Sequence, residues 1–517
     1  MIPLFKVFMS PYASKNLSPI LESGYIAQGP QVELFEKSLR EYFNYPYILS
    51  LNSATSGLTL ALRLLNLSPS SEVISTPLTC TATNWPILAN GFKIKWADVD
   101  PKNCNIDLES VEKNITKNTK AIMVVHWGGY PVDLDKLRQI VERAENKYGY
   151  RIPIIEDCAH AFGAKYKGGM IGTHGNICVF SLQAIKHLTT GDGGLIFLPD
   201  KETYERAKLL RWFGIDRQQR SGGGDLRMES NVPEWGYKFH MNDINASIGL
   251  SNLPFVETNT QRMRDVANRY RTELQELYPY VQLLEEEKGF ESARWIFTIK
   301  IFDKSGFISF MSEKGIMVSQ VHNRNDSHSC VSESQTLLSQ LDKLEKSIIC
   351  IPAGWWITND NQTYIIKCIQ EWCYKLRFKT LEPGDSYKEY LSLLEQLTKY
   401  KYPEITSQEI FEKVLDDIKK QDGKIFLGYL NEELVCTGKI LIEKKFGNSV
   451  AHIEDVVVDS KHRGKGIGGV LLRFLNDHIK DSYKSVLGCR PGLCDFYSSN
   501  GFVKSGCLME KRNDKRI

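Results

Sequence analysis

The chain has 517 residues, of which 42% are hydrophobic and 25% are charged, as is usual for globular proteins. Lys and Arg total 65 and Asp and Glu total 62, so the net charge of +3 gives no compositional case for binding nucleic acid or an anionic membrane. The apolar runs are far shorter than the ~20 residues of a membrane-spanning helix. The 12 cysteines are scattered and form no CxxC pair, which argues against a disulfide scaffold or a metal cluster. We therefore expect a cytoplasmic protein without a metal site.

The length predicts about three core-sized units. We place the first at residues 1–285, the second at 286–375 and the third at 376–517. The last boundary falls where a short strand beginning near Arg377 leads into a turn at Glu382–Asp385, and a long amphipathic helical stretch is expected after it.

Residues 45–200 alternate between buried apolar runs and amphipathic stretches. A helix is predicted over Leu134–Lys147 because its apolar residues recur at helical spacing. The predicted strands are Ala121–His126, Pro153–Cys158, Ile177–Leu182 and Leu195–Leu198. Strand, helix and strand in this rhythm favour parallel βαβ units, in which functional loops lie at the carboxyl ends of strands.

The later elements follow a different pattern. Residues 245–285 are predicted to be helical, and a small α+β unit follows with strands at Trp295–Phe302 and Ile348–Pro352. The third unit is predicted to hold a run of strands and then a helix opened by a glycine-rich turn. Its predicted strands are Ile425–Tyr429, Leu434–Glu443, Ala451–Val458 and Ser485–Cys489.

Lys186 is the central feature of the first unit. It lies just past a predicted strand, in a loop rich in Ser, Thr and Gly that runs from Ser181 to Gly194. A lysine amine can form a Schiff base with a carbonyl when its surroundings favour the neutral form. A solvated surface lysine is the ordinary alternative, so the interpretation depends on the neighbouring motifs.

Two neighbouring motifs support a cofactor site. Asp157 ends a predicted strand, where its carboxylate could keep a pyridine nitrogen protonated, as pyridoxal phosphate (PLP) requires; the alternative is a helix N-cap. Asn52–Ser56 precedes the apolar helical run Leu58–Leu65, and small residues and hydroxyls at a helix start can bind phosphate through backbone N–H groups. Ser181 would supply a further hydroxyl.

Together these motifs resemble the DegT/DnrJ/EryC1/StrS family of PLP-dependent sugar aminotransferases over residues 10–376. The matching segments are Gly29–Glu36, Asn52–Leu58, Thr76–Thr79, His126–Pro131, Glu156–Gly163, the Lys186 loop and Met241–Ala246. The resemblance implies an α/β, fold-type-I aminotransferase with a parallel-rich central sheet and a small α+β domain. It also implies a homodimer with its site at the subunit interface, nucleotide-linked keto sugars as substrates and glutamate as the amino donor.

The resemblance assigns roles residue by residue. Lys186 is the Schiff-base lysine and the proton shuttle, Asp157 pairs with the pyridinium nitrogen, and His160 lies beside the ring. The phosphate is held by Ala54, Thr55 and Ser181, and Asn242 reaches the partner subunit's cofactor phosphate.

Two positions refine the comparison. Family members often carry an aromatic residue where this chain has Cys80, so ring stacking must come from elsewhere, with Trp85 and Trp127 as candidates. Related dehydratases replace the lysine with histidine, so Lys186 favours transamination over deoxygenation.

The segment from Arg211 to Met228 holds several arginines around glycines. It is either a loop for the sugar-nucleotide diphosphate or a solvated loop.

The C-terminal unit carries a second site. The strand Ile453–Asp459 leads into a glycine-rich turn and the apolar helix Val470–Leu475, an arrangement that can cradle a pyrophosphate, although a plain surface turn is the default interpretation. The order of elements through Phe502 resembles that of the GNAT acetyltransferases, and the sequence of these segments is similar to that of glucosamine-6-phosphate N-acetyltransferase. The turn residues assigned to acetyl-CoA are Arg463, Gly464, Lys465, Gly466, Ile467 and Gly468.

The remaining assignments in this unit are catalytic. Tyr497 would stabilise the leaving thiolate, Glu454 and Asp455 would lie at the amine-binding side, and Glu454 is the candidate base, acting through a water. The acidic partners for a hexosamine phosphate are absent from Gly488–Leu493, so glucosamine 6-phosphate is not the expected acceptor.

These inferences combine into a bifunctional enzyme. We expect transamination of a nucleotide-linked 4-keto-6-deoxy sugar with glutamate, followed by N-acetylation from acetyl-CoA. The C4 position comes from family tendency, and C3 is an alternative. One alternative function keeps only the aminotransferase active, with the GNAT-like domain serving binding or dimerisation. Another is a regulatory sensor that binds PLP without turnover.

Overall fold

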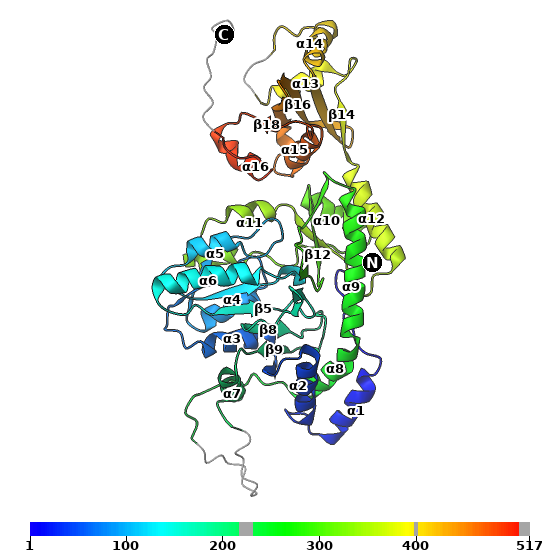
Figure 1. Cartoon of the computed structure of the whole chain (residues 1–517). Helices are drawn as coiled ribbons and strands as arrows, with labels where there is room; N and C mark the ends of the chain where they lie inside the picture. Colours follow the sequence, from blue (N-terminus) through cyan, green and yellow to red (C-terminus); the bar gives the residue numbers. More distant parts are fainter. Residues whose placement is uncertain (217–230, 335, 398–401, 506–517) are drawn as a thin grey trace. The chain divides into compact units, whose positions relative to one another are not determined.

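The computed structural model describes residues 1–216, 231–334, 336–397 and 402–505 (Figure 1). The chain divides into two compact units. The first contains Met1–Glu273, Leu283–Lys300 and Met311–Tyr364, and the second contains Leu274–Gln282, Ile301–Phe310 and the chain from Ile365 onward. Among the described residues, no helix combines the length and the apolar character needed to cross a bilayer.

A seven-stranded sheet forms the centre of the first unit, in the order β1-β9-β8-β5-β4-β2-β3. The strands from β8 to β3 are parallel to their neighbours, whereas β9 is antiparallel to both β8 and β1. The expected α/β fold with a parallel-rich sheet is therefore confirmed. The bounds are β1 (Ile48–Leu51), β2 (Glu72–Ser75), β3 (Lys93–Trp96), β4 (Thr119–Val125), β5 (Ile154–Asp157), β8 (Ile177–Ser181) and β9 (Gly194–Phe197).

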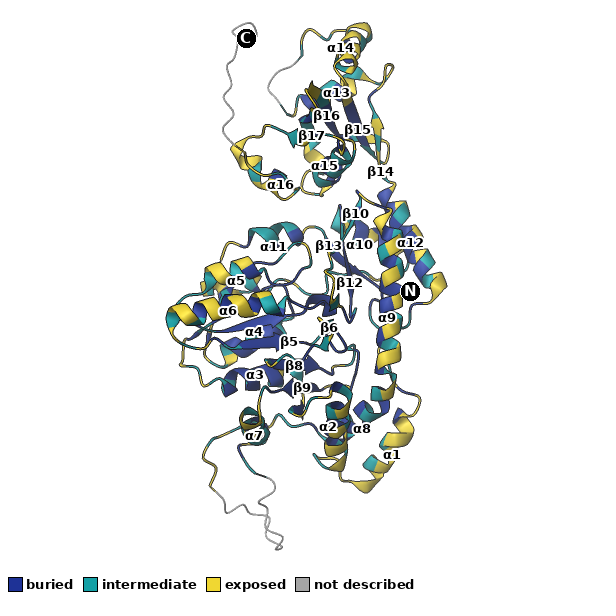
Figure 2. Ribbon diagram, in the orientation of Figure 1, coloured by how far each residue is buried: buried dark blue, intermediate teal, exposed yellow. Residues whose placement is uncertain are grey.

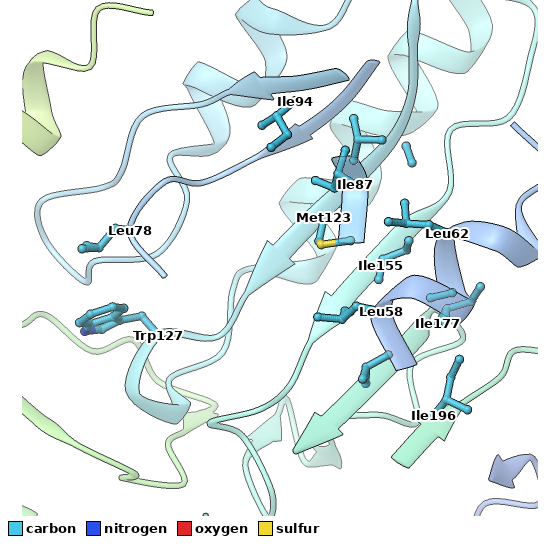
Figure 3. Close-up of a cluster of buried hydrophobic side chains, with 14 of the residues drawn as sticks. Leu58, Leu62, Leu78, Ile87, Ile94, Met123, Trp127, Ile155, Ile177 and Ile196 are labelled. Carbon is cyan, nitrogen blue, oxygen red and sulfur yellow. The ribbon is translucent and has the colours of Figure 1, made fainter. Parts of the chain in front are cut away.

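Helices cover both faces of this sheet because successive strand residues point to opposite sides. On one face, α3 (Ala54–Leu64) and α4 (Thr81–Ala89) pack on a cluster that includes Met123 (Figure 3). On the other face, α5 (Leu108–Asn114) and α6 (Leu134–Tyr148) pack on the neighbouring residue Val124. The predicted helix over 134–147 is α6, which Asp133 caps by accepting a hydrogen bond from the Lys136 N–H group.

The same unit holds further helices and a small sheet. The helical region predicted over 245–285 is confirmed as α8 (Asp243–Asn252) and α9 (Val256–Gln275), but it is wrong beyond Gln275, where the chain turns into the strand β10 (Val281–Leu283). The helix α2 (Pro30–Phe43) buries Phe35 and Leu39 against strand residues of β8 and β9. The predicted strands of the small α+β part are confirmed as the antiparallel pair β12 (Phe297–Ile301) and β13 (Ile348–Ile351).

The second unit contains a five-stranded sheet in the order β14-β15-β16-β17-β18. Four strands are antiparallel neighbours and β18 is parallel to β17. Burial is concentrated in the middle of β15 and β16, and Figure 2 shows that α14 exposes one face. The bounds are β14 (Leu376–Thr380), β15 (Gly423–Leu430), β16 (Glu433–Lys445), β17 (Asn448–Val458), β18 (Lys484–Val486), α13 (Tyr387–Leu394), α14 (Gln408–Lys420), α15 (Ile467–Asp477) and α16 (Cys494–Ser498).

Two details of this unit differ from expectation. The single helical stretch predicted after Asp385 is wrong, because α13 and α14 are separate helices and Ser407 caps the second by accepting a hydrogen bond from the Ile410 N–H group. The strand predicted over Ser485–Cys489 ends at Val486, ahead of the short helical turn that begins at Pro491.

Candidate functional site

Lys186 follows the end of β8 and is half-buried. Its Nζ lies 3.5 Å from the centroid of the Trp295 ring. Burial lowers the pKa of Lys186 to about 7, although attraction to Asp157 opposes this change. A substantial fraction of this amine is therefore neutral near pH 7, and a neutral amine is the form that attacks a carbonyl.

Asp157 is the last residue of β5 and is buried. Thr83 Oγ1 donates a hydrogen bond of 2.6 Å to its Oδ2, and the Ala159 N–H group donates one of 3.0 Å to its Oδ1. Burial raises the pKa of Asp157, and these two hydrogen bonds oppose the rise. The residues after Asp157 form a turn and no named helix begins there within the described chain, so the helix N-cap interpretation is wrong.

A buried ion pair lies directly behind this carboxylate. His126 Nε2 is 2.9 Å from Glu156 Oε2, and its Nδ1 accepts a hydrogen bond from the Val132 N–H group. Asn176 Nδ2 also donates to Glu156 at 2.6 Å. These bonds occupy both nitrogens of His126 and both carboxylate oxygens of Glu156, so the cluster fixes the end of β5 next to Asp157.

A stack of rings covers the other side of Lys186. The rings of His160 and Trp295 are stacked, with centroids 3.8 Å apart, and His322 lies parallel to His160 at 5.5 Å. Burial lowers the pKa of His160 and lowers that of His322 to about 4, so both rings are neutral near pH 7. His160 Nδ1 and His322 Nε2 have no hydrogen-bond partner within the described part of the chain.

Trp295 and His322 are site residues that the sequence did not identify. Trp295 is fixed by a hydrogen bond from its Nε1 to the Ile185 carbonyl oxygen at 3.0 Å. The predicted stacking candidates lie elsewhere in the network: Trp127 meets His160 edge-on at 6.4 Å, and Trp85 contacts His328.

The predicted phosphate site lies at the N-terminus of α3, where Ala54 and Thr55 are the first two helical residues. Ser53 caps this helix by accepting a hydrogen bond from the Ser56 N–H group. The backbone of β9 packs closely on the start of α3 at Gly194, the first residue of β9. Only glycine fits there, because a Cβ atom would lie 2.5 Å from the Ser53 carbonyl oxygen and 2.6 Å from the Ala54 nitrogen. Ser181 ends the neighbouring strand β8. The strand ends therefore bring the helix start and the hydroxyl to one edge of the sheet.

Two further predicted residues hold local contacts. Asn242 caps α8, where its side-chain oxygen accepts a hydrogen bond of 2.9 Å from the Asn245 N–H group. Arg211 is buried and donates from Nη1 to Glu36 Oε1 and to the Ser50 carbonyl oxygen, so it serves the fold and is not available to a diphosphate. The part of that predicted loop from Arg217 to Met228 lies outside the described residues.

The glycine-rich turn of the second unit has the backbone of a pyrophosphate loop. Gly464 and Gly466 both have φ of +81°, which favours glycine, and α15 begins at Ile467 directly after them. Arg463 donates from Nε to the Val458 carbonyl oxygen and is exposed, as is Gly464. The first N–H groups of any α-helix lack intrahelical partners, so the start of α15 is suited to an anion.

The predicted catalytic residues of this unit lie on two elements. Tyr497, on α16, is buried, and burial raises the pKa of its hydroxyl. Glu454 and Asp455 lie on β17, and Lys439 of the neighbouring strand β16 contacts Glu454 Oε2 at 3.0 Å and Asp455 Oδ2 at 2.8 Å. Over the described residues, no hydrogen bond joins Tyr497 to either carboxylate. The two acids therefore share one lysine.

These features define a fold-type-I, PLP-dependent aminotransferase followed by a GNAT domain. The chain belongs to the DegT/DnrJ/EryC1/StrS aminotransferase family, whose model matches residues 10–370, and the acetyltransferase (GNAT) family model matches residues 389–502.

Solved structures and curated relatives are similar to the first part of the chain. The sugar aminotransferase CalS13 from Micromonospora echinospora is 44% identical, with a TM-score of 0.69 over 72% of this chain and 100% of that one. Spr1654 from Streptococcus pneumoniae, solved in its PLP form, is 25% identical, with a TM-score of 0.66 over 72% of this chain and 99% of that one. The UDP-4-amino-4-deoxy-L-arabinose–oxoglutarate aminotransferase of Shewanella sediminis is 36% identical over 272 residues, which are 52% of this chain and 68% of that protein.

The residues of the first site fit PLP. Thr55 at the start of α3 is exposed and can meet a phosphate, and the buried Asp157 carboxylate suits a protonated pyridine nitrogen. The Lys186 amine, with its lowered pKa, suits the aldehyde.

Proposed function

We propose that the chain transaminates a nucleotide-linked 4-keto-6-deoxy sugar with glutamate and then N-acetylates the amino sugar with acetyl-CoA. The observation that carries this proposal is the Lys186 amine, whose pKa is lowered beside Asp157, in a chain that also carries the turn Arg463–Gly468. The first site would make the amine, and the second would consume it. The proposed large, small and GNAT domains are residues 1–285, 286–375 and 376–517.

Each residue of the first site has a proposed task. The Ala54 and Thr55 backbone and the Ser181 hydroxyl hold the phosphate of PLP, which supplies an electron sink when bound. Asp157 keeps the ring nitrogen protonated, and His160 packs beside the ring. Nζ of Lys186 takes the proton from the α-carbon of glutamate and later delivers one to the sugar carbon that receives the amine.

The relatives support the substrate class. The name of the Shewanella sediminis enzyme describes a UDP-linked 4-amino sugar and oxoglutarate, and CalS13 is described as a sugar aminotransferase. For this chain we propose the same pairing of a nucleotide-linked keto sugar with glutamate.

Acetyl transfer would use the second unit. The N–H groups at the start of α15, with Arg463 and Lys465, bind the pyrophosphate of acetyl-CoA. The sugar amine attacks the acetyl carbonyl carbon, the carbon–sulfur bond breaks, and the Tyr497 hydroxyl donates a proton to the thiolate. Glu454 accepts the amine proton through a water, with Lys439 holding it in place.

We also propose a homodimer, in which Asn242 reaches the partner subunit's cofactor phosphate. Exposed apolar side chains at the N-cap of α1 (Ala13–Ser23), on α1, on the segment after it and on α2 support an interface between two copies of the chain. Both helices pack on α8, the helix that Asn242 caps. The exposed residues are Tyr12, Leu21, Tyr25, Ile26 and Leu34.

The proposal predicts a two-step product pattern. Purified protein with PLP, glutamate and acetyl-CoA, incubated with UDP-, dTDP- and GDP-linked 4-keto-6-deoxy sugars, should convert one series to the acetamido sugar, as read by mass spectrometry. The Tyr497→Phe variant should accumulate the free amino sugar, because acetylation loses its proton donor and slows by about 10²-fold or more. Its rate of amine formation should stay at the wild-type value.

Other product patterns would contradict parts of the proposal. An amino sugar that is never acetylated by the wild-type protein would favour an aminotransferase whose GNAT-like domain serves binding or dimerisation. No amination in any series, with PLP bound, would favour a sensor. Equal acetylation by wild-type and Tyr497→Phe proteins would remove Tyr497 from the mechanism.

A further inference from the structure

Two cysteines lie side by side in the second unit, close to Tyr497. Cys489 follows β18, Cys494 is the first residue of α16, and their Sγ atoms are 3.9 Å apart. Cys489 is exposed and Cys494 is half-buried, so small molecules in solution can reach the pair. The S–S bond of a disulfide is about 2.05 Å long, so the two sulfurs would have to approach each other by about 2 Å to form one.

The chain between the two cysteines can make this adjustment. The residues Arg490–Leu493 are all exposed, so their movement disturbs no core packing. Gly492 has open space around it, since a Cβ atom added there would meet no atom within 4 Å. Arg490 donates from Nη2 to the Leu397 carbonyl oxygen at 3.2 Å, and an exposed guanidinium can exchange this bond for one to water.

Exposure distinguishes this pair from a second pair of cysteines. Cys158 and Cys178 also hydrogen-bond to each other, but both are buried in the first unit, where a dissolved oxidant cannot reach them. Burial and the hydrogen bond to Cys494 raise the pKa of Cys489, so its thiol form predominates near pH 7. Because the thiolate is the nucleophile, oxidation of the exposed pair should be faster at mildly alkaline pH.

The position of Tyr497 links the pair to the proposed acetyl transfer. Tyr497 lies one turn after Cys494 on α16, so the two side chains are neighbours on one side of this short helix. Burial raises the pKa of the Tyr497 hydroxyl, and the charge of Cys489 adds to the rise, as expected for side chains that lie close together. A disulfide would pull on the first residue of α16 and move this hydroxyl, and a displacement of about 1 Å can slow a reaction by about 10²-fold.

We propose that Cys489 and Cys494 form a site of reversible oxidation by low-molecular-weight disulfides such as glutathione disulfide, and that oxidation slows acetyl transfer by displacing Tyr497. One cysteine thiolate attacks a sulfur of the oxidant, breaks its S–S bond and releases a glutathione thiolate. The other cysteine thiolate attacks the resulting mixed disulfide and releases the second glutathione thiolate. The protein gives up two electrons and two thiol protons, and the oxidant becomes two molecules of glutathione. The effect on rate rests on the proposed acetyl transfer, whereas the oxidation site does not.

Mass spectrometry measures the oxidation independently of activity. The full-length protein is treated with glutathione disulfide, alkylated and digested with trypsin, which cleaves after Lys484 and Lys504 and spares the bond between Arg490 and Pro491. Both cysteines then lie in one peptide, which should escape alkylation and be two hydrogen atoms lighter than its reduced form. Dithiothreitol should reverse this change. Acetylation of a supplied amino sugar nucleotide should slow at least about tenfold on oxidation and recover on reduction.

Two variants serve as controls. The double variant Cys489→Ser, Cys494→Ser should acetylate at the wild-type rate with or without the oxidant. Cys330→Ser, which removes an exposed cysteine of the first unit, should remain as sensitive to the oxidant as wild type.

The contrary results are distinct. A peptide alkylated at both cysteines, or one that carries glutathione in place of an internal disulfide, would overturn the oxidation site. Oxidised protein that acetylates as fast as reduced protein would overturn the link to Tyr497. If the disulfide formed but the reduced protein acetylated no amino sugar, the proposed acetyl transfer would fail and the oxidation site would stand.

Discussion

Replacing Lys186 with alanine should abolish amination, with a fall of at least about 10³-fold, because both the carbonyl-binding amine and the proton shuttle are lost. The amine is suited to this chemistry because burial lowers its pKa to about 7. The measurement is the change in absorbance of the bound cofactor when glutamate is added, followed in rapid mixing, together with the rate of sugar amination.

Two controls show whether the Lys186→Ala variant loses its chemistry or its fold. Lys201→Ala, an exposed substitution at the start of α7 (Lys201–Leu210), should react at the wild-type rate. The Lys186→Ala protein should still acetylate a supplied amino sugar nucleotide, because the second unit carries that activity. An unchanged amination rate in Lys186→Ala would contradict the assignment of this lysine.

Changing Asp157 to asparagine should slow amination by about 10²–10³-fold, because a neutral amide cannot hold the ring nitrogen in its protonated form. The side chain keeps its shape, and Thr83 Oγ1 and the Ala159 N–H group can still bond to it. Loss of the carboxylate should also lower the pKa of Lys186 below about 7, since attraction to Asp157 raises that pKa. The rate of cofactor capture, measured against pH, should therefore rise at lower pH than in wild type.

Thr83→Val is the matched control for this variant. It removes one hydrogen bond to Asp157 Oδ2 and leaves the charge, so the expected loss is about 2–10-fold. If Thr83→Val and Asp157→Asn slowed amination equally, or if the capture profile of Asp157→Asn moved to higher pH, the charge of Asp157 would not have the proposed role.

Much of the fold could be predicted because the sheet is built from short, largely buried strands that alternate with amphipathic helices. The strands β4, β5 and β8 and the helix α6 were expected from these patterns. The direction of β9 was not, because periodicity does not encode it. The connection from β8 to β9 contains the Lys186 loop and no named helix, and a connection without a crossover helix gives antiparallel neighbours.

The site was predictable where its residues follow strand ends. Lys186 and Asp157 could be found in this way, since chemistry at the carboxyl edge of such a sheet comes from these positions. Trp295 and His322 could not, because they come from distant segments and only the tertiary packing places their rings beside His160. Arg211 shows the opposite error: its charge suggested a diphosphate ligand, but it neutralises the buried Glu36.

The most direct test of the central claim is to find where the cofactor attaches. Protein loaded with PLP, reduced with borohydride and digested should yield one modified peptide in mass spectrometry, with the reduced cofactor on Lys186. Modification of another lysine, or an unmodified Lys186 peptide from protein that retains bound PLP, would contradict the account.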